Sequence, residues 1–334
     1  MSLNLSKPLN IGTLKIRNKA FLAPMSGVTD VPFRKLAWRF GAGAVVSEMV
    51  ASEALVCGQG EMELKICKSG SAVHVVQLAG REEKWMRLAA KMAVENGADQ
   101  IDINMGCPAK RVTTGYSGSA LMRDLDHATR LIEAVTSEVK IPVSLKMRLG
   151  WDDHSINAPD LGMRAENAGV SMITVHGRTR CQFYKGKADW NAVRAVRDKI
   201  SIPLIVNGDI GSIAAANSAT TASGADGVMV GRAAYGAPWL PGQISGSMPE
   251  NVKPDDPAFI SNLAIEHYEM MLSFYGKAVG IKQSRKHLSW YFDRIATASN
   301  TDLRTDILTS LDPANVISAF RKAAGRTDNI AVAA

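Results

Sequence analysis

Short apolar segments alternate with longer amphipathic segments along the first two thirds of the chain, at intervals of roughly 25 to 35 residues. The apolar segments have the length and the β-branched content of buried strands. The amphipathic segments have helical periodicity, most clearly in Glu82–Asn96, where one stripe is formed by Trp85, Leu88, Ala89, Met92 and Ala93 and Gly97 ends the pattern. This alternation predicts a parallel β-sheet with crossover helices.

Eight strands are predicted, over residues 21–25, 44–48, 73–78, 100–104, 142–146, 172–176, 203–207 and 227–231. Eight βα units close a (β/α)8 barrel, whereas open three-layer sheets rarely contain so many. We therefore expect an α/β fold built on a TIM barrel.

The pattern changes after the eighth predicted strand, because prolines crowd a short segment and no regular element can run through it. These residues are Pro238, Pro241, Pro249, Pro254 and Pro257. Helical periodicity follows, over residues 260–275, 281–298 and 314–323. We predict a catalytic barrel domain, residues 1–244, and a small C-terminal helical domain, residues 245–334.

Nearly every predicted strand ends in a polar side chain, at the face where barrel enzymes hold their active sites. One such residue is most often an ordinary strand-end residue, but a complete series at one face predicts a catalytic site. The series is Ser26, Glu48, Gln77, Asn104, Cys107, Lys146, Arg148, His176, Asn207, Asp209 and Arg232. The glycine turns at 207–210 and 231–233 follow the last two strands, where barrels commonly bind phosphate.

The type of cofactor can be narrowed from the same positions. No G-x-G-x-x-G motif follows a strand, since Gly41-Ala42-Gly43 lacks the third glycine, so a Rossmann nicotinamide site is not supported. Lys146 and Gln77 suit a flavin, because a cation beside the ring stabilises the reduced anion. A single glycine-lined cradle suits FMN, which carries one phosphate.

Composition fits a cytoplasmic enzyme. The chain has 334 residues, 46% of them hydrophobic, which is enough to bury a large core and a smaller one. No signal peptide and no apolar run of about 18 residues is present, so neither export nor a membrane span is expected. The four cysteines, Cys57, Cys67, Cys107 and Cys181, lack metal-ligand or disulfide spacing. We expect reduced thiols, no metal, and a monomer, although the sequence leaves the oligomeric state open.

Charge favours a polyanionic substrate. The net charge is +7, and residues 245–334 carry ten basic and ten acidic side chains, so the excess lies in the barrel. The segments 107–123 and 176–188 contain basic residues and no acidic one. Segment 271–292 is also free of acids and contains Lys282, Arg285 and Lys286, which we call the basic stripe, next to Trp290 and Tyr291.

Several motifs together resemble the tRNA-dihydrouridine synthases, most closely their bacterial B-type, NifR3-like branch. The matching segments span nearly the whole chain: Ala23–Asp30, Ser47–Met49, Val76–Leu78, Asp102–Pro108, Lys146–Arg148, His176–Thr179, Asn207–Ile210, Gly231–Ala233 and, in the helical domain, Arg285–Tyr291. Each motif is weak alone, and the set is specific.

The resemblance implies that NADPH reduces FMN, that the reduced flavin passes hydride to C6 of a uracil in tRNA, and that Cys107 protonates C5. A thiol with its ordinary pKa near ~8.5 is mostly protonated at neutral pH and suits this role. It also implies an FMN site made of Pro24, Met25, Ser26, Gln77, Lys146, His176, Asn207, Gly208, Asp209, Gly231 and Arg232. Asn104, Arg148, Arg178 and the basic stripe would bind the substrate.

Two alternatives remain open. An FMN-dependent barrel reductase of a small molecule, such as a dihydroorotate dehydrogenase or an enoate reductase, would explain the cradle but leave the basic loops and the helical domain without a role. Those pyrimidine enzymes also tend to have Asn after Cys-Pro, where this chain has Ala109. A non-catalytic regulator or RNA-binding module would not need Cys107 and Lys146.

Overall fold

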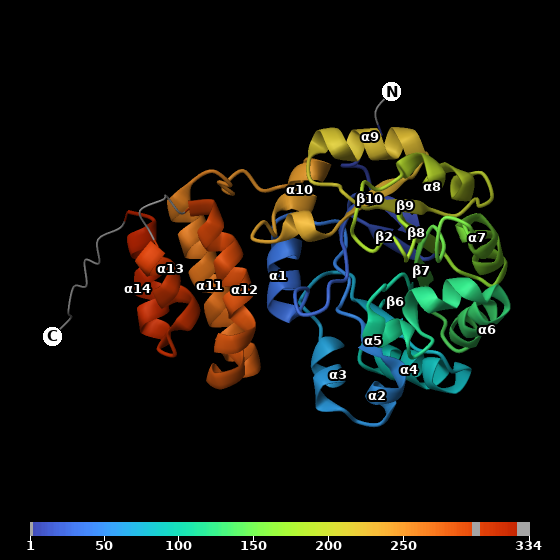
Figure 1. Cartoon of the computed structure of the whole chain (residues 1–334), viewed down its shortest axis with the longest axis horizontal. Helices are drawn as coiled ribbons and strands as arrows, with labels where there is room; N and C mark the ends of the chain where they lie inside the picture. Colours follow the sequence, from blue (N-terminus) through green and yellow to red (C-terminus); the bar gives the residue numbers. More distant parts are fainter. Residues whose placement is uncertain (1–2, 296–300, 326–334) are drawn as a thin grey trace. The chain divides into compact units, whose positions relative to one another are not determined.

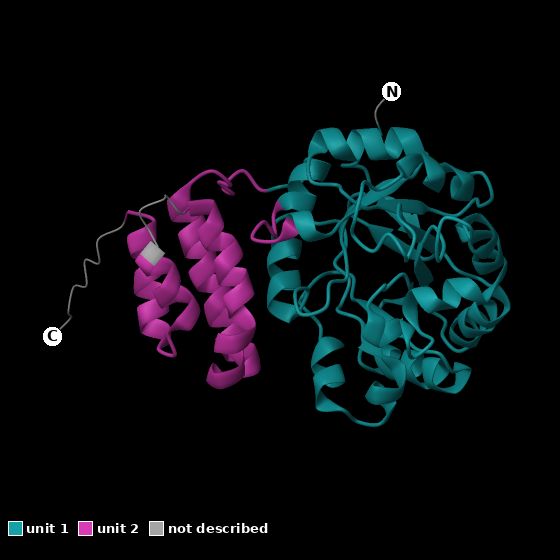
Figure 2. Ribbon diagram, viewed as in Figure 1, with its two compact units in different colours: residues 1–233, 240–248 teal, residues 234–239, 249–334 magenta. Residues whose placement is uncertain are grey.

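The computed structural model describes residues 3–295 and 301–325, and the chain forms two compact units (Figure 2). The first contains residues 1–233 and 240–248, and the second contains residues 234–239 and 249–334. Segment 234–239 belongs to the second unit because Tyr235 stacks on Trp290, with ring centroids 4.0 Å apart. The domain boundary expected after residue 244 falls inside helix α10 (Leu240–Ser245).

The first unit is a barrel of parallel strands surrounded by helices (Figure 1). Its sheet runs in the order β3-β10-β9-β8-β7-β6-β5-β4. The strands are β3 (Ala20–Leu22), β4 (Val50–Ala51), β5 (Val75–Ala79), β6 (Gln100–Met105), β7 (Val143–Arg148), β8 (Met172–His176), β9 (Leu204–Asn207) and β10 (Gly227–Val230). Parallel bridges from Leu22 to Val45 and from Val46 to Val75 close the sheet on itself. The predicted TIM barrel is confirmed.

Two predicted strands are shorter than expected, for local reasons. The first ends at Leu22 because Pro24 has no N–H and Met25 begins a turn, accepting hydrogen bonds from Val28 and Thr29. The second is reduced to the two bridges followed by β4, because Ser47 turns its hydroxyl to the backbone oxygen of Glu48.

The helices and a terminal hairpin complete the barrel. The helices are α1 (Val31–Arg39), α2 (Ser52–Val56), α3 (Gly60–Lys65), α4 (Glu83–Glu95), α5 (Lys110–Thr113), α6 (Leu125–Thr136), α7 (Ala158–Asn167), α8 (Trp190–Arg197), α9 (Ile213–Ser223) and α10, with 3-10 turns η1 (Gly118–Arg123) and η2 (Arg232–Ala234). The buried face of α4 carries Met86, Ala89 and Ala93, whereas Leu88 is exposed, so the predicted stripe was partly wrong. The hairpin β1 (Leu9–Ile11) and β2 (Leu14–Ile16) packs on the barrel core with Ile11 and Ile16.

The second unit is helical, as predicted. It contains α11 (Pro257–Tyr275), α12 (Lys277–Ile295), α13 (Thr301–Thr309) and α14 (Pro313–Ala323). Asp256 and Asp312 cap α11 and α14 just before a proline, which is why both helices begin earlier than their apolar periodicity. Helix α13 was not predicted, and residues 296–298 of the second predicted helix lie outside the described residues. Within the described ranges, no helix has the length and apolar character of a membrane span.

Candidate active site

Strand register brings the predicted polar side chains to one end of the barrel. Asn104 on β6 is the register partner of Lys146 on β7. Farther round the sheet, Arg148 pairs with His176, and His176 pairs with Asn207 on β9. These residues lie at the carboxyl ends of their strands, so their side chains converge on one mouth of the barrel.

Lys146 is the central cation of this mouth. Its ammonium donates to Asn207 Oδ1 at 3.2 Å, and Asn207 Nδ2 donates to the Met229 carbonyl at 2.8 Å. Burial, and next the charge of Arg148, lower the pKa of Lys146 to about 8, against the opposing effect of Asp102. The side chain therefore stays charged at neutral pH, with donor capacity beyond its bond to Asn207.

His176 is neutral, because burial and the cations Arg148, Lys146, Arg178 and Arg232 hold its pKa well below 6.5. Its Nε2 lies 3.2 Å from Arg178 Nη1, which can only donate, so the imidazole proton sits on Nδ1. Arg178 is 2% exposed and pairs with Asp209 at 2.6 Å. The buried Arg178 side chain thus donates to exposed residues, the carboxylate of Asp209 and the backbone carbonyls of Lys185 and Gly186.

Cys107 sits on a turn that other side chains hold in place. Asn104 Oδ1 accepts from the backbone N–H groups of Cys107 at 2.9 Å and Gly106 at 3.2 Å. Ser119 donates from its hydroxyl, at 2.8 Å, to the Cys107 carbonyl. The thiol carries no disulfide and is partly exposed. The turn is therefore fixed through its backbone, and Cys107 as a residue is partly exposed.

Arg148 supports the same turn from the next strand. Its Nε donates to the Gly106 carbonyl at 2.8 Å, and its Nη1 donates to the carbonyls of Thr179 at 2.8 Å and Phe183 at 2.9 Å. Burial lowers its pKa to about 10, so it stays charged. Arg148 thus ties the Cys107 turn to the loop after β8.

A buried acid beneath the mouth was not predicted. Asp102 Oδ2 accepts from Gln77 Nε2 at 2.6 Å, and Oδ1 accepts from the Ser144 hydroxyl at 2.6 Å. Burial raises the pKa of Asp102 to about 6. The signal was present in β6, where Gln100, Asp102 and Asn104 alternate with apolar residues and so share one face of a buried strand.

The glycine turns and the Pro24–Ser26 turn are neighbours, because β3 pairs with β10 and Ala23 N–H donates to the Val230 carbonyl at 2.9 Å. A Cβ on Gly231 would meet only Asn207 Nδ2, at 4.0 Å, so the backbone there is open to an approaching group. Gly208 has φ +113°, and a Cβ would come within 2.8 Å of Ala188 Cβ. Arg232 is exposed and begins η2.

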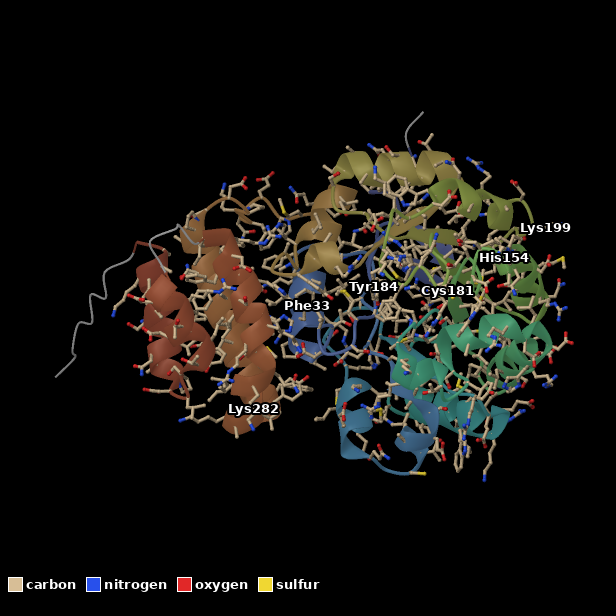
Figure 3. All side chains as sticks on the ribbon, viewed as in Figure 1. Phe33, His154, Cys181, Tyr184, Lys199 and Lys282 are labelled. Atoms are coloured by element: carbon tan, nitrogen blue, oxygen red, sulfur yellow. The ribbon has the colours of Figure 1, made fainter. Side chains whose placement is uncertain are left out.

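Aromatic side chains and cations line the loops around the mouth. Tyr184, labelled in Figure 3, lies under the guanidinium of Arg232, 4.5 Å from its ring centroid. Trp151 is flanked by Arg123 at 4.9 Å and Arg180 at 4.6 Å. These contacts join the loops after β6, β7 and β8, and sequence reasoning missed both aromatic residues.

The basic stripe lies on α12 in the helical unit, where Lys282 is exposed and Arg285 and Lys286 are half-buried (Figure 3). Tyr291 is fully buried, with its hydroxyl 3.2 Å from His267 Nδ1. The two aromatic residues next to the stripe therefore pack within the unit. In the two described stretches of the chain, no group of His, Cys, Asp and Glu could hold a metal ion.

Comparison with known proteins gives consistent matches. Residues 21–324 match the family model described as "Dihydrouridine synthase (Dus)". A "Probable tRNA-dihydrouridine synthase" of Rhizobium leguminosarum bv. phaseoli is 56% identical over 91% of this chain and 94% of the relative. A "tRNA-dihydrouridine synthase B" of Xanthomonas axonopodis pv. citri is 41% identical over 85% of this chain and 86% of the relative. The structure of "Morphinone reductase" superposes with a TM-score of 0.54 at 16% identity, covering 78% of this chain and 93% of that one.

Proposed function

The chain belongs to the dihydrouridine synthase family, and from this premise we propose that it reduces uridines of tRNA to dihydrouridine with FMN at the barrel mouth and NADPH as reductant. The observation that carries the proposal is the convergence of a charged, partly buried Lys146 and the braced Cys107 turn on one mouth. When bound, the flavin would supply the hydride for the pyrimidine ring.

The residues of the mouth fit FMN. Gly231 leaves open backbone where a phosphate can approach, and Arg232 adds a cation beside it. Lys146 offers a desolvated positive charge, which suits a ring that becomes anionic on reduction. Gln77 adds a side-chain amide that is bonded to Asn104, the register partner of Lys146. We propose that Pro24, Met25, Ser26, Gln77, Lys146, His176, Asn207, Gly208, Asp209, Gly231 and Arg232 form the FMN site.

Cys107 is proposed as the proton donor to C5 of the uracil. Its thiol is the partly exposed group on a turn whose backbone is held on both sides, which is the placement that a positioned acid needs. Asn104 accepts hydrogen bonds from that turn, and Arg148 donates one to it. We therefore assign both residues to holding Cys107 in place, and Arg178 to holding Asp209.

The RNA contacts are proposed at two places. Around the mouth, Arg123 and Arg180 both hold their guanidinium groups against the ring of Trp151, and Lys110 and Arg111 are exposed on α5. Such groups attract phosphates without reading sequence. In the helical unit, the basic stripe supplies a second phosphate-binding surface. A base must leave its stack to reach the mouth, as in other enzymes that act on bases.

The test of this proposal is a paired assay on purified protein. We expect the protein to be yellow, to release one FMN per chain, and to form dihydrouridine in tRNA when supplied with NADPH. A small-molecule reductase would also hold FMN, but would reduce orotate or an enone and leave tRNA unchanged. A protein that cannot be reconstituted with FMN would refute the flavin site itself.

A further inference from the structure

A continuous chain of buried hydrogen bonds runs through the barrel interior to the Cys107 turn. Gln77, Asp102 and Ser144 are register partners on β5, β6 and β7. Asp102, only 2% exposed, accepts from Ser144 and from Gln77, at 2.6 Å each. Ser144 in turn accepts from Gln100 Nε2 at 2.8 Å.

The chain continues toward the mouth through two amides. Gln77 Oε1 accepts from Asn104 Nδ2 at 2.7 Å. Asn104 Oδ1 accepts from the N–H groups of Gly106 and Cys107, at 3.2 and 2.9 Å. Gln77 and Asn104 thus link Asp102 to the backbone of the proposed proton donor, while Ser144 and Gln100 support Asp102 from the other side.

The two ends dictate how both amides are oriented. An ionised carboxylate only accepts, so the nitrogen of Gln77 must face Asp102 and its oxygen must face Asn104. The backbone N–H groups at 106 and 107 only donate, so the oxygen of Asn104 must face the turn. Each amide nitrogen has two N–H groups and uses one in this chain. The second N–H of Gln77 and the second N–H of Asn104 can therefore donate to another group.

Burying a carboxylate in the barrel interior costs free energy, and filling space there does not require one. A buried carboxylate loses its hydration, and an apolar residue would fill the barrel layer without that penalty. Asp102 also lies two residues before Asn104, the register partner of Lys146. Its charge raises the pKa of the Lys146 ammonium against the effect of burial.

We propose that Asp102 is a positioning residue of this site: its carboxylate orients Gln77 and Asn104, so fixing the Cys107 turn, and it places a counter-charge on the strand next to that of Lys146. The inference rests on the proposed function where flavin binding is the measurement. The position of the Cys107 turn can be measured without flavin.

The first test is FMN titration of flavin-stripped protein across pH, comparing wild type with Asp102→Asn. We expect about tenfold weaker binding at neutral pH, since one charge-assisted hydrogen bond is lost and Lys146 is less often protonated. In wild type, binding should weaken as pH rises past about 8, the pKa of Lys146. In the variant that decline should begin at a lower pH than in wild type, because the carboxylate that favours the charged ammonium is gone. Ser144→Ala is the matched control, because it removes one hydrogen bond to Asp102 but no carboxylate, so its pH midpoint should lie nearer to that of wild type than the midpoint of Asp102→Asn does.

The second test needs no flavin, and Gln77→Leu covers the case in which Asp102→Asn does not fold; only variants with a cooperative thermal melt are compared. Alkylation of Cys107 by iodoacetamide is followed by peptide mass spectrometry, normalised to Cys57 and Cys181, in wild type, Asp102→Asn and Gln77→Leu. We expect severalfold faster alkylation in both variants, because the turn loses its brace. Unchanged alkylation and an unchanged pH midpoint would overturn the role of Asp102. A wild type that fails to bind FMN would refute the proposed function, while the alkylation result would still decide the inference.

Discussion

Replacing Lys146 with methionine removes the central cation of the barrel mouth while keeping a side chain of similar length. Lys146 donates to Asn207 Oδ1 at 3.2 Å and stays charged with a pKa of about 8. A hydrogen bond from a charged group contributes about 1.5–3 kcal/mol, which corresponds to roughly 10- to 100-fold in a dissociation constant. We therefore expect FMN to bind Lys146→Met roughly 10- to 100-fold more weakly than wild type.

The same substitution should leave stability nearly unchanged. The buried ammonium loses hydration in the folded protein, as its lowered pKa shows, and methionine avoids that cost. Against this, Asn207 Oδ1 loses its donor, which costs about 1–3 kcal/mol for a buried acceptor. The two effects oppose each other, so Tm should move by only a few degrees.

Fluorescence quenching of FMN by the stripped protein measures the binding, and a thermal melt measures stability. Lys199→Met is the matched control, since Lys199 is exposed just before β9, at the opposite end of that strand from Asn207 (Figure 3). FMN affinity equal to wild type in Lys146→Met, with a normal melt, would refute the assignment of Lys146 to the flavin site.

Three further predictions address the acid, the RNA contact and pH. Cys107→Ala should keep FMN and oxidise NADPH, yet form dihydrouridine about 10²- to 10⁴-fold more slowly, and wild-type turnover would show that the thiol is only a turn residue. Changing the three residues of the basic stripe to Glu should leave the flavin spectrum intact, weaken tRNA binding, and flatten the slope of log affinity against log salt by ~0.7–0.9 per lost phosphate contact. An unaltered slope would move the RNA contact to the barrel loops. Burial holds the pKa of His267 at about 3 and the pKa of His287 well below 6.5. In the unfolded chain both rings take up a proton below about pH 6.5, whereas in the folded protein they stay neutral, so the free energy of unfolding falls as the pH drops below that value. Unfolding monitored by circular dichroism should show a loss of about 1.4 kcal/mol per pH unit per histidine below that point, and a flat profile from pH 7 to 5 would contradict their burial as neutral rings.

The barrel could be predicted from the sequence, because each strand is a short apolar run that can be recognised from its own residues. Residues 172–176 were predicted to the residue. The strand at 44–48 was predicted too long. Its apolar pattern does not reveal that the Ser47 hydroxyl donates to the backbone carbonyl of Glu48. Helix α13 was missed because it has no clear apolar periodicity.

Hydrogen-bond partners could not be predicted, because they depend on register between strands far apart in sequence. Residue type and strand-end position predict that Arg148 and Arg178 bind the substrate. In the structure, their guanidinium groups donate to loop carbonyls and to the Asp209 carboxylate. Asp102 gives the converse case, since its importance arises only when Gln77 and Ser144 become its neighbours. Residue types at strand ends could therefore be predicted, and their partners could not.

The most direct measurement of the central claim is the dihydrouridine content of tRNA, mapped by position, in cells lacking this gene and in cells complemented with wild type or with Cys107→Ala. The account predicts that deletion removes dihydrouridine from at least one tRNA position, that wild type restores it, and that Cys107→Ala does not. Dihydrouridine unchanged at every position after deletion would contradict the account.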